Sequence, residues 1–205
     1  MADPDFWVLL GTDYCGKSSV LAALADRGGR VRPTSYDPPM LTGDYRALAQ
    51  LPAALGKAYA GGNSPDYVMA LLNVAVAYLR DSVLTAPPES TPLLDSYYYK
   101  ILVKCRLLGL TDGPWQEYWQ SLPRPSGVVL LDVAPATAWR RSGAGALCNP
   151  MEYYGPAPDV ESFTRFQRDL RAGLLDAVRG LRVEHVPAGQ DIAATTDHVL
   201  RAMKE

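Results

Sequence analysis

One run near the N-terminus constrains this chain more than any other feature: Trp7-Val8-Leu9-Leu10-Gly11-Thr12-Asp13-Tyr14-Cys15-Gly16-Lys17-Ser18-Ser19. It reads as a short apolar strand followed by the spacing G-x-x-x-x-G-K-S, the pattern of a phosphate-binding P-loop. The two glycines let the backbone curl around an anion and turn its N–H groups inward. The helix that follows adds the positive end of its dipole. The run therefore predicts a parallel α/β fold with a nucleoside triphosphate site at residues 11–19.

Within this loop the chemistry assigns two side chains. Lys17 would reach the β- and γ-phosphates of ATP, and the Ser18 hydroxyl would ligate Mg²⁺. Val20, Leu21 and Leu24 then follow at helical spacing, before Gly28-Gly29 ends the helix. The competing interpretation is a glycine-rich turn in an ordinary α/β domain.

The cysteines indicate a reducing compartment. Cys15, Cys105 and Cys148 are odd in number and far apart in the sequence, so they form neither a disulfide framework nor a zinc pattern. Cys15 lies inside the P-loop, where a helix N-terminus would lower the pKa of a thiol. A small filler residue is the alternative interpretation of Cys15.

Composition narrows the class of protein. At 205 residues, with 48% hydrophobic residues, the chain predicts a single domain over 1–205. No run of 18 apolar residues is present, and the acidic start with Asp3 and Asp5 does not resemble a targeting signal. The formal charge of −2 argues against nucleic acid and anionic membranes as partners. We expect a cytoplasmic protein.

Strand and helix signals alternate along the chain. This alternation predicts a three-layer α/β/α sandwich with a five-stranded parallel sheet and helices on both faces. The helix over 65–84 is apolar almost all round, which favours either burial in the core or a homodimer interface. The expected strands cover 6–10, 30–35, 91–94, 127–132 and 183–186, and the expected helices cover 17–27, 43–59, 65–84, 97–108, 114–121, 135–141, 159–179 and 191–203.

Acidic residues stand where strands end, at the edge where such sheets bind ligands. Tyr36-Asp37 follows the second strand and Asp95-Ser96-Tyr97 follows the third. Asp95 is the candidate Mg²⁺ ligand beside Ser18, with a helix N-cap as its alternative role. Asp132 ends another apolar strand and competes for the metal, although a structural cap before Pro135 explains it as well.

Residues 142–158 are rich in glycine, proline and asparagine and predict a short lid over a reacting phosphate. Arg140 and Arg141 precede this segment and would neutralise the transferred group, since phosphoryl transfer needs positive charge around it. Arg165 and Arg168 follow one helical turn apart. A role in the lid and a place on a solvated helix face remain equally open for these two.

In order along the chain, these motifs resemble those of the thymidylate kinases, a family of P-loop nucleoside monophosphate kinases. The likeness runs through nearly the whole chain, and the P-loop is its most specific part. The matching positions are Asp13 in the loop, Ser35-Tyr36-Asp37-Pro38 after the second strand, Arg80 on the long helix, Asp95-Ser96-Tyr97, Leu130-Leu131-Asp132-Val133-Ala134-Pro135, and Phe163 to Arg168 after the lid.

Three positions depart from the family pattern. Tyr14 stands where the family has glycine or arginine, and Tyr36 and Ser96 replace arginines of the acceptor site. Neither serine nor tyrosine reproduces the fork with which arginine holds a phosphate. Lys100 lies one turn after Ser96 and would partly replace the missing charge.

The resemblance implies an ATP-dependent kinase of a nucleoside monophosphate, with Lys17, Asp13, Asp95, Arg140 and Arg141 in catalysis. The departures keep open a kinase of a nucleoside or another small metabolite, and a nucleotide-binding homologue without turnover. A P-loop hydrolase or switch protein fits less well, because no Asn-Lys-x-Asp motif is present. The expected acceptor-binding residues are Tyr36, Asp37, Arg80, Ser96, Tyr97 and Lys100.

Overall fold

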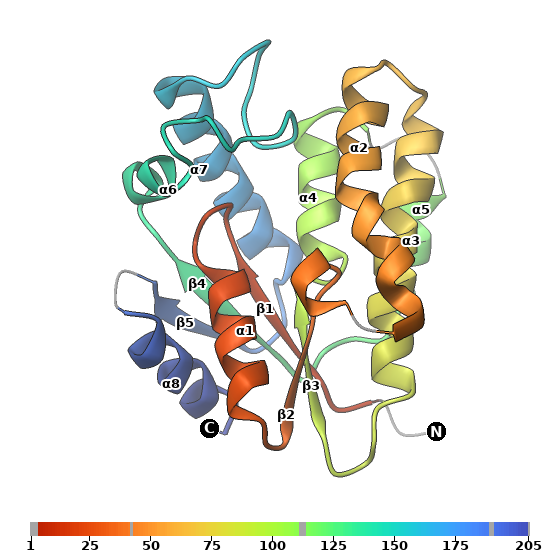
Figure 1. The fold of residues 1–205 in the computed structure, drawn as a ribbon, viewed down its shortest axis with the longest axis vertical. Coiled ribbons are helices and arrows are strands. Elements are labelled where there is room, and N and C mark those ends of the chain that lie inside the picture. The colour runs from red at the N-terminus through yellow and green to blue at the C-terminus, as the bar shows by residue number, and fades with distance from the viewer. Residues whose placement is uncertain (1–3, 42, 111–113, 189–190, 205) are drawn as a thin grey trace.

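Five parallel strands form the centre of the molecule (Figure 1). The computed structural model describes residues 4–41, 43–110, 114–188 and 191–204. In spatial order the sheet runs β2-β3-β1-β4-β5, with every neighbouring pair parallel. This arrangement confirms the predicted fold class. The strands are β1 (Trp7–Gly11), β2 (Val31–Thr34), β3 (Thr91–Asp95), β4 (Gly127–Asp132) and β5 (Val183–Pro187).

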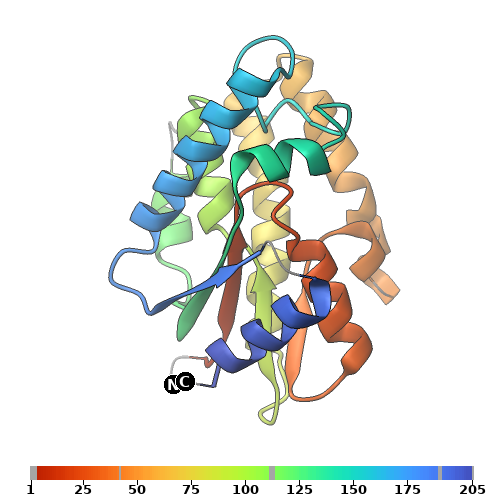
Figure 2. The same cartoon turned by 90° about the vertical axis from the view of Figure 1, so that its left-hand side faces the viewer.

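Helices cover both faces of the sheet, as Figures 1 and 2 show. One apolar cluster joins the even-numbered side chains of β1 to α2, α3, α4, α5 and α7. A second cluster joins Trp7 and Leu9 of β1 to α1 and α8. The helices are α1 (Lys17–Arg27), α2 (Leu51–Ala60), α3 (Pro65–Leu84), α4 (Tyr99–Leu107), α5 (Trp115–Gln120), α6 (Pro135–Arg141), α7 (Val160–Ala177) and α8 (Ile192–Ala202).

The helix expected over 43–59 is two elements. A 3₁₀-helix, η2, spans Gly43–Gln50, and α2 begins only at Leu51. Pro52 explains the division, because proline lacks an N–H and is tolerated only in the first turn of an α-helix. A further short 3₁₀-helix, η1, covers Pro38–Met40, where the two prolines exclude longer regular structure.

Helix α3 has the predicted bounds and the predicted start. Ser64 caps it by accepting a hydrogen bond from the Tyr67 N–H, and Pro65 occupies the first turn. Length and composition alone would allow α3 to span a membrane, but seven of its side chains lie in the core. Tyr67, Val74 and Leu84 are exposed on its outer side. The homodimer stays a prediction.

Helix α4 begins two residues later than expected. Ser96 and Tyr97 adopt φ values of 61° and 48°, a left-handed conformation that is strained for residues other than glycine. The chain thus makes a tight turn directly after β3 before it enters the helix. This turn holds Asp95 and Ser96 at the carboxyl end of the sheet, beside the P-loop.

The segment 142–158 joins α6 to α7 through turns and bends, without helix or strand. In Figure 2 it lies above the P-loop, on the side to which the carboxyl ends of the strands point. The predicted lid segment therefore lies next to the predicted phosphate site.

Candidate functional site

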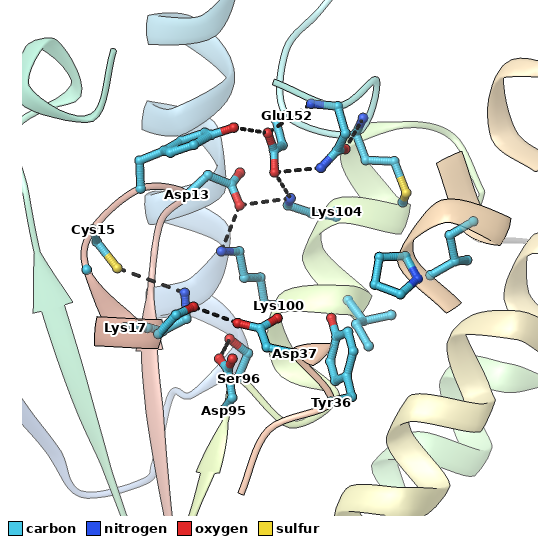
Figure 3. A pocket seen from close by; sticks show the side chains of 18 of the residues that line it. Asp13, Cys15, Lys17, Tyr36, Asp37, Asp95, Ser96, Lys100, Lys104 and Glu152 are labelled. Carbon is cyan, nitrogen blue, oxygen red and sulfur yellow. Dashed lines mark hydrogen bonds and ion pairs between the residues drawn. The ribbon is translucent and has the colours of Figure 1, made fainter. Parts of the chain in front are cut away.

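A cavity of about 620 Å³ opens at the carboxyl end of the sheet. The P-loop lines one side (Figure 3), and the ends of β2 and β3, the first turns of α4, parts of α2 and α3 and part of the lid also line the cavity. Most of the residues expected at the site meet here. Those that line the cavity are Asp13, Tyr14, Cys15, Gly16, Lys17, Ser18, Ser19, Tyr36, Asp37, Asp95, Ser96, Lys100 and Arg141.

The P-loop has the close packing that its glycines predict. A Cβ on Gly11 would lie 2.5 Å from Cys15 Sγ and 2.8 Å from the carbonyl oxygen of Leu131, so no larger residue fits there. Gly16 has a φ of 101°, which favours glycine. Cys15 is buried against this turn, and it fills the space that Gly11 leaves.

Asp13 is the most heavily bonded side chain of the loop. Its Oδ1 lies 2.8 Å from Lys100 Nζ and 2.9 Å from Lys104 Nζ. Gln167 of α7 donates to Oδ2 at 3.0 Å and accepts from the Asp13 N–H at 2.9 Å. Burial alone would raise the pKa of Asp13, but the two ammonium groups and Gln167 outweigh it and hold this pKa well below its usual range.

Lys17 lies deep in the cavity with a 9% exposed side chain. Its Nζ donates to Cys15 Sγ at 3.9 Å. Burial by itself would lower the pKa of Lys17, but electrostatic attraction to Cys15, Asp95 and Asp13 raises this pKa overall. Lys17 is therefore a permanent positive charge at the position where the P-loop pattern places phosphate.

Three side chains that carry oxygen atoms, Ser18, Asp37 and Asp95, line the same cavity. Ser18 Oγ donates to Asp37 Oδ2 at 2.6 Å. Asp95 is buried and accepts from Ser35 Oγ at 2.9 Å and from Ser96 Oγ at 2.8 Å. Hard oxygen ligands in small number suit Mg²⁺, which is held by one or two carboxylates together with substrate phosphates. Among the described residues no group of three or more His, Cys, Asp or Glu could hold a metal ion by itself.

The lid is tied to the P-loop through Tyr14, whose φ is 57°. The Tyr14 hydroxyl lies 2.8 Å from the Leu147 carbonyl oxygen and 2.9 Å from Glu152 Oε2. Glu152 also accepts from the Asn149 backbone N–H at 3.1 Å and from its side-chain amide at 2.7 Å. Its Oε1 is 4.0 Å from Lys104 Nζ. Burial and the nearby Asp13 charge raise the pKa of Glu152. We call this set of contacts the lid latch.

Sequence reasoning missed Lys104, Glu152 and Gln167. Lys104 follows Lys100 by one helical turn, and this spacing was the signal available for it. Glu152 and Gln167 lie more than 130 residues from the P-loop that they contact, so no local pattern points to them.

The two arginines before the lid have different positions. Arg141 donates to the carbonyl oxygens of Tyr14 and Cys15, each at 3.2 Å, and to that of Ala188 at 3.0 Å. It therefore braces the outside of the P-loop at the mouth of the cavity. Arg140 is exposed, donates to Thr137 Oγ1 at 3.2 Å, and does not line the cavity.

Arg80 and Tyr97 also lie outside the cavity lining. Arg80 donates to Tyr118 Oη of α5 at 2.7 Å and to Asp81 at 2.8 Å. Tyr97 is 1% exposed and packs edge-on against Phe6, with ring centroids 5.7 Å apart. The left-handed turn at Ser96-Tyr97 sends this ring into the core rather than into the cavity.

Gly11 and Thr12 shape the loop without lining the main cavity. Thr12 instead lines a smaller hollow of about 240 Å³ together with Asp132, Arg168 and Arg171. Asp132 forms a two-bond ion pair with Arg171, at 2.9 and 2.5 Å, which occupies both of its oxygens. Arg165 stacks over the Tyr154 ring at 4.7 Å.

The side of the cavity opposite the P-loop is mainly apolar. Tyr36 lies there in Figure 3, across the cavity from Lys17, and it precedes Asp37. Burial, with Asp95 and Asp37 nearby, raises the pKa of the Tyr36 hydroxyl, so it stays a neutral donor. The apolar lining residues are Pro52 and Leu55 of α2, Leu72 of α3, Ile101 of α4 and Met151 of the lid.

Solved structures with this fold were found by comparison, whereas no family model and no curated protein matches the sequence. Deoxyadenosine kinase from M. mycoides, with the products dCMP and dCDP bound, superposes with a TM-score of 0.65 at 12% identity, covering 97% of this chain and 98% of that chain. The same kinase with bound dATP gives 0.61 at 13% identity, covering 97% and 99%. At this identity the likeness establishes the fold alone.

Proposed function

We propose that this protein is an ATP-dependent phosphotransferase that acts on a nucleoside or nucleotide, with a nucleoside hydroxyl as the preferred acceptor. The donor half rests on the P-loop, with Lys17 and Ser18 facing the cavity. The similar folds of a deoxyadenosine kinase bound to dATP and to dCMP support a nucleotide chemistry. The thymidylate kinase resemblance implied a monophosphate acceptor, and the charges of the cavity favour an uncharged one.

The observation that carries the proposal is the Asp37 carboxylate beside Ser18. Asp37 lines the cavity 2.6 Å from Ser18 Oγ, between the P-loop and the apolar side. A hydroxyl acceptor loses a proton as it attacks the γ-phosphorus, and a carboxylate at this place would take it. The new P–O bond forms to the acceptor oxygen while the bond to the β-phosphate breaks, which releases ADP.

The cations of the cavity are largely committed within the protein. Lys100 and Lys104 both pair with Asp13, and Arg141 donates to backbone carbonyls. The lining residues carry four cationic side chains (Lys17, Lys100, Lys104 and Arg141) and four carboxylates (Asp13, Asp37, Asp95 and Glu152). A phosphorylated acceptor would add about two negative charges to this balanced set, whereas a nucleoside adds none.

Positioning and electrostatics would carry the catalysis. Lys17 would neutralise the charge of the transferred group, and Ser18 with Asp95 would hold Mg²⁺. The ion would supply positive charge that offsets the charge of the phosphates. The lid latch would exclude water from the reaction.

A nucleoside monophosphate is the second candidate acceptor. Lys100 and Lys104 line the cavity, and a phosphate that displaces Asp13 from them would find two ammonium groups. Transfer to it would give a nucleoside diphosphate.

An acceptor panel with ATP and Mg²⁺ tests the function. We expect ADP release with nucleosides, a kcat/KM at least tenfold lower for the corresponding monophosphates, and loss of turnover in Lys17→Met. Lys57→Met, an exposed lysine of α2, is the control variant. Asp37→Asn should keep ATP binding and lose transfer to nucleosides. ATP binding without acceptor-dependent ADP release would instead identify a nucleotide-binding protein that lacks turnover.

A further inference from the structure

Gly56 occupies an unusual place in the described chain: the middle of helix α2, with its backbone in the wall of the cavity. A Cβ built on Gly56 would meet no atom within 4 Å. Glycine inside a helix destabilises it relative to alanine, since it has more conformational freedom to lose. Neither a left-handed φ nor a close neighbour explains this glycine.

Gly173 of α7 gives the contrast. A Cβ on Gly173 would lie 2.5 Å from Val103 Cγ1 of α4, so the close packing of α4 and α7 requires glycine there. Gly56 has no such neighbour. Gly56 lines the cavity, and the absence of a side chain leaves the space beside its Cα open.

The surroundings of Gly56 are apolar. Pro52 and Leu55 come from its own helix, Leu72 from α3 and Ile101 from α4. Met151 of the lid lines the same cavity. Such side chains suit a flat ring that stacks and packs rather than a charged group. In Figure 3 the P-loop residues Asp13, Cys15 and Lys17 lie on the opposite side of the cavity from α2.

From this arrangement we propose that Gly56 is a specificity-determining position that opens the acceptor slot to bicyclic, purine-sized rings. The inference rests on the proposed function, because it assigns the substrate class of the same site. A branched side chain at position 56 would narrow the slot, and single-ring acceptors would still fit. Since α2 lies away from the transferred phosphoryl group, the change would act on binding rather than on the chemical step.

The test compares wild-type protein with Gly56→Val and Gly56→Ala. Ala53→Val is the matched control, because Ala53 is exposed on the same helix and does not line the cavity. Binding of adenosine-type and cytidine-type deoxynucleosides is measured by calorimetry without ATP, and kcat and KM are measured with ATP. Thermal unfolding shows that each variant is folded.

We expect Gly56→Val to weaken purine nucleoside binding about 10- to 100-fold, the range for a small change of shape in an apolar pocket. Pyrimidine nucleosides should change less than threefold, and kcat less than twofold. Gly56→Ala should keep or raise the melting temperature and have an intermediate effect on purine binding. Ala53→Val should leave both classes unchanged.

Equal losses for purines and pyrimidines in Gly56→Val, or unchanged purine binding, would overturn the inference. So would a wild-type protein that binds no purine nucleoside. Failure of the proposed function is a separate result. In that case nucleosides bind and Gly56→Val still weakens purine binding more than pyrimidine binding, but no nucleoside is phosphorylated.

Discussion

Lys100 of α4 and Asp13 of the P-loop form a buried ion pair at the centre of the cavity, with Nζ 2.8 Å from Oδ1. Burial lowers the pKa of Lys100 to about 8, with Lys17 and Lys104 adding repulsion that Asp13 only partly offsets. Lys100 is therefore both charged at neutral pH and close to losing that charge.

This pKa predicts an alkaline limit to activity. Raising the pH through about 8 removes the Lys100 proton and with it the ion pair with Asp13 in the cavity. We therefore expect kcat/KM to fall. Lys100→Arg should keep its activity at higher pH, because a guanidinium does not deprotonate there. A pH profile of kcat/KM for both proteins measures this.

Stability should change in the opposite direction from activity. The unfolded chain binds the Lys100 proton more tightly than the folded chain does, because the pKa is about 8 in the fold against an ordinary lysine value of 10.5. Between these pH values this group makes the free energy of unfolding rise with pH. If kcat/KM and the free energy of unfolding changed in the same direction with pH, the alkaline limit to activity could not be assigned to Lys100.

Asp13→Asn should be strongly destabilising. The substitution removes the negative partner of two buried ammonium groups, Lys100 and Lys104. Breaking a buried pair in this way costs about 3–5 kcal/mol, which denaturant unfolding measures. The double variant Asp13→Asn/Lys104→Met should recover part of the loss, since it removes one unpaired charge. Additive losses in the double variant would exclude the coupling.

The lowered pKa of Asp13 predicts how its contribution to the stability of the fold depends on pH. Because this pKa lies below its unfolded value, the stabilising contribution of Asp13 is complete above the unfolded pKa, about 3.9. It is lost only as the pH falls through the folded pKa. Between pH 7 and pH 5 the Asp13 contribution should therefore not change.

Tyr14→Phe should loosen the lid. The change removes the hydroxyl that contacts the Leu147 carbonyl and Glu152 and keeps the ring against Phe163. The free energy of unfolding should fall by about 1 kcal/mol. Hydrogen exchange in 142–158 should become faster than in the wild-type protein, whereas exchange in α3 should not change. Exchange in the lid that matches the wild-type rate would show that the latch does not hold it.

Tyr97→Phe should stabilise the protein. Tyr97 Oη is buried and has no hydrogen-bond partner among the described residues, and an unsatisfied buried hydroxyl costs about 1–3 kcal/mol. Its removal should raise the melting temperature by about 2–4 °C for each kcal/mol recovered. Tyr36→Phe, at a residue that lines the cavity, is the control and should not produce this rise. A lower melting temperature for Tyr97→Phe would indicate a partner for the hydroxyl.

The parts of the molecule that follow local rules were predictable. The P-loop spacing placed Gly11 to Ser18 at the carboxyl end of a buried strand, and the apolar run over 65–84 predicted the bounds of α3. The alternation of strands and helices was sufficient to predict five parallel strands with helices on both faces, but it did not predict the strand order β2-β3-β1-β4-β5. The carboxylates after β2 and β3 then had to meet at the edge of this sheet.

The side chains that failed to reach the cavity show the limits of such patterns. A motif places Tyr97 beside the site, but two left-handed residues turn its ring into the core. Arg80 lies on the expected helix, yet it donates to Tyr118 of α5 and does not line the cavity. Both outcomes depend on contacts between residues that are far apart in the sequence. The periodicity of the sequence does not predict such contacts.

Gln167 accepts from the Asp13 N–H and donates to the Asp13 carboxylate, and this double contact joins positions 154 residues apart. During synthesis the P-loop leaves the ribosome before α7 does, so this double contact can form only after Gln167 has been made. A nascent chain that ends before α7 therefore lacks both contacts between Gln167 and Asp13. On the proposed function, the P-loop should bind nucleotide only once α7 has been made, and fragments truncated before α7 should sediment and fluoresce the same with or without ATP.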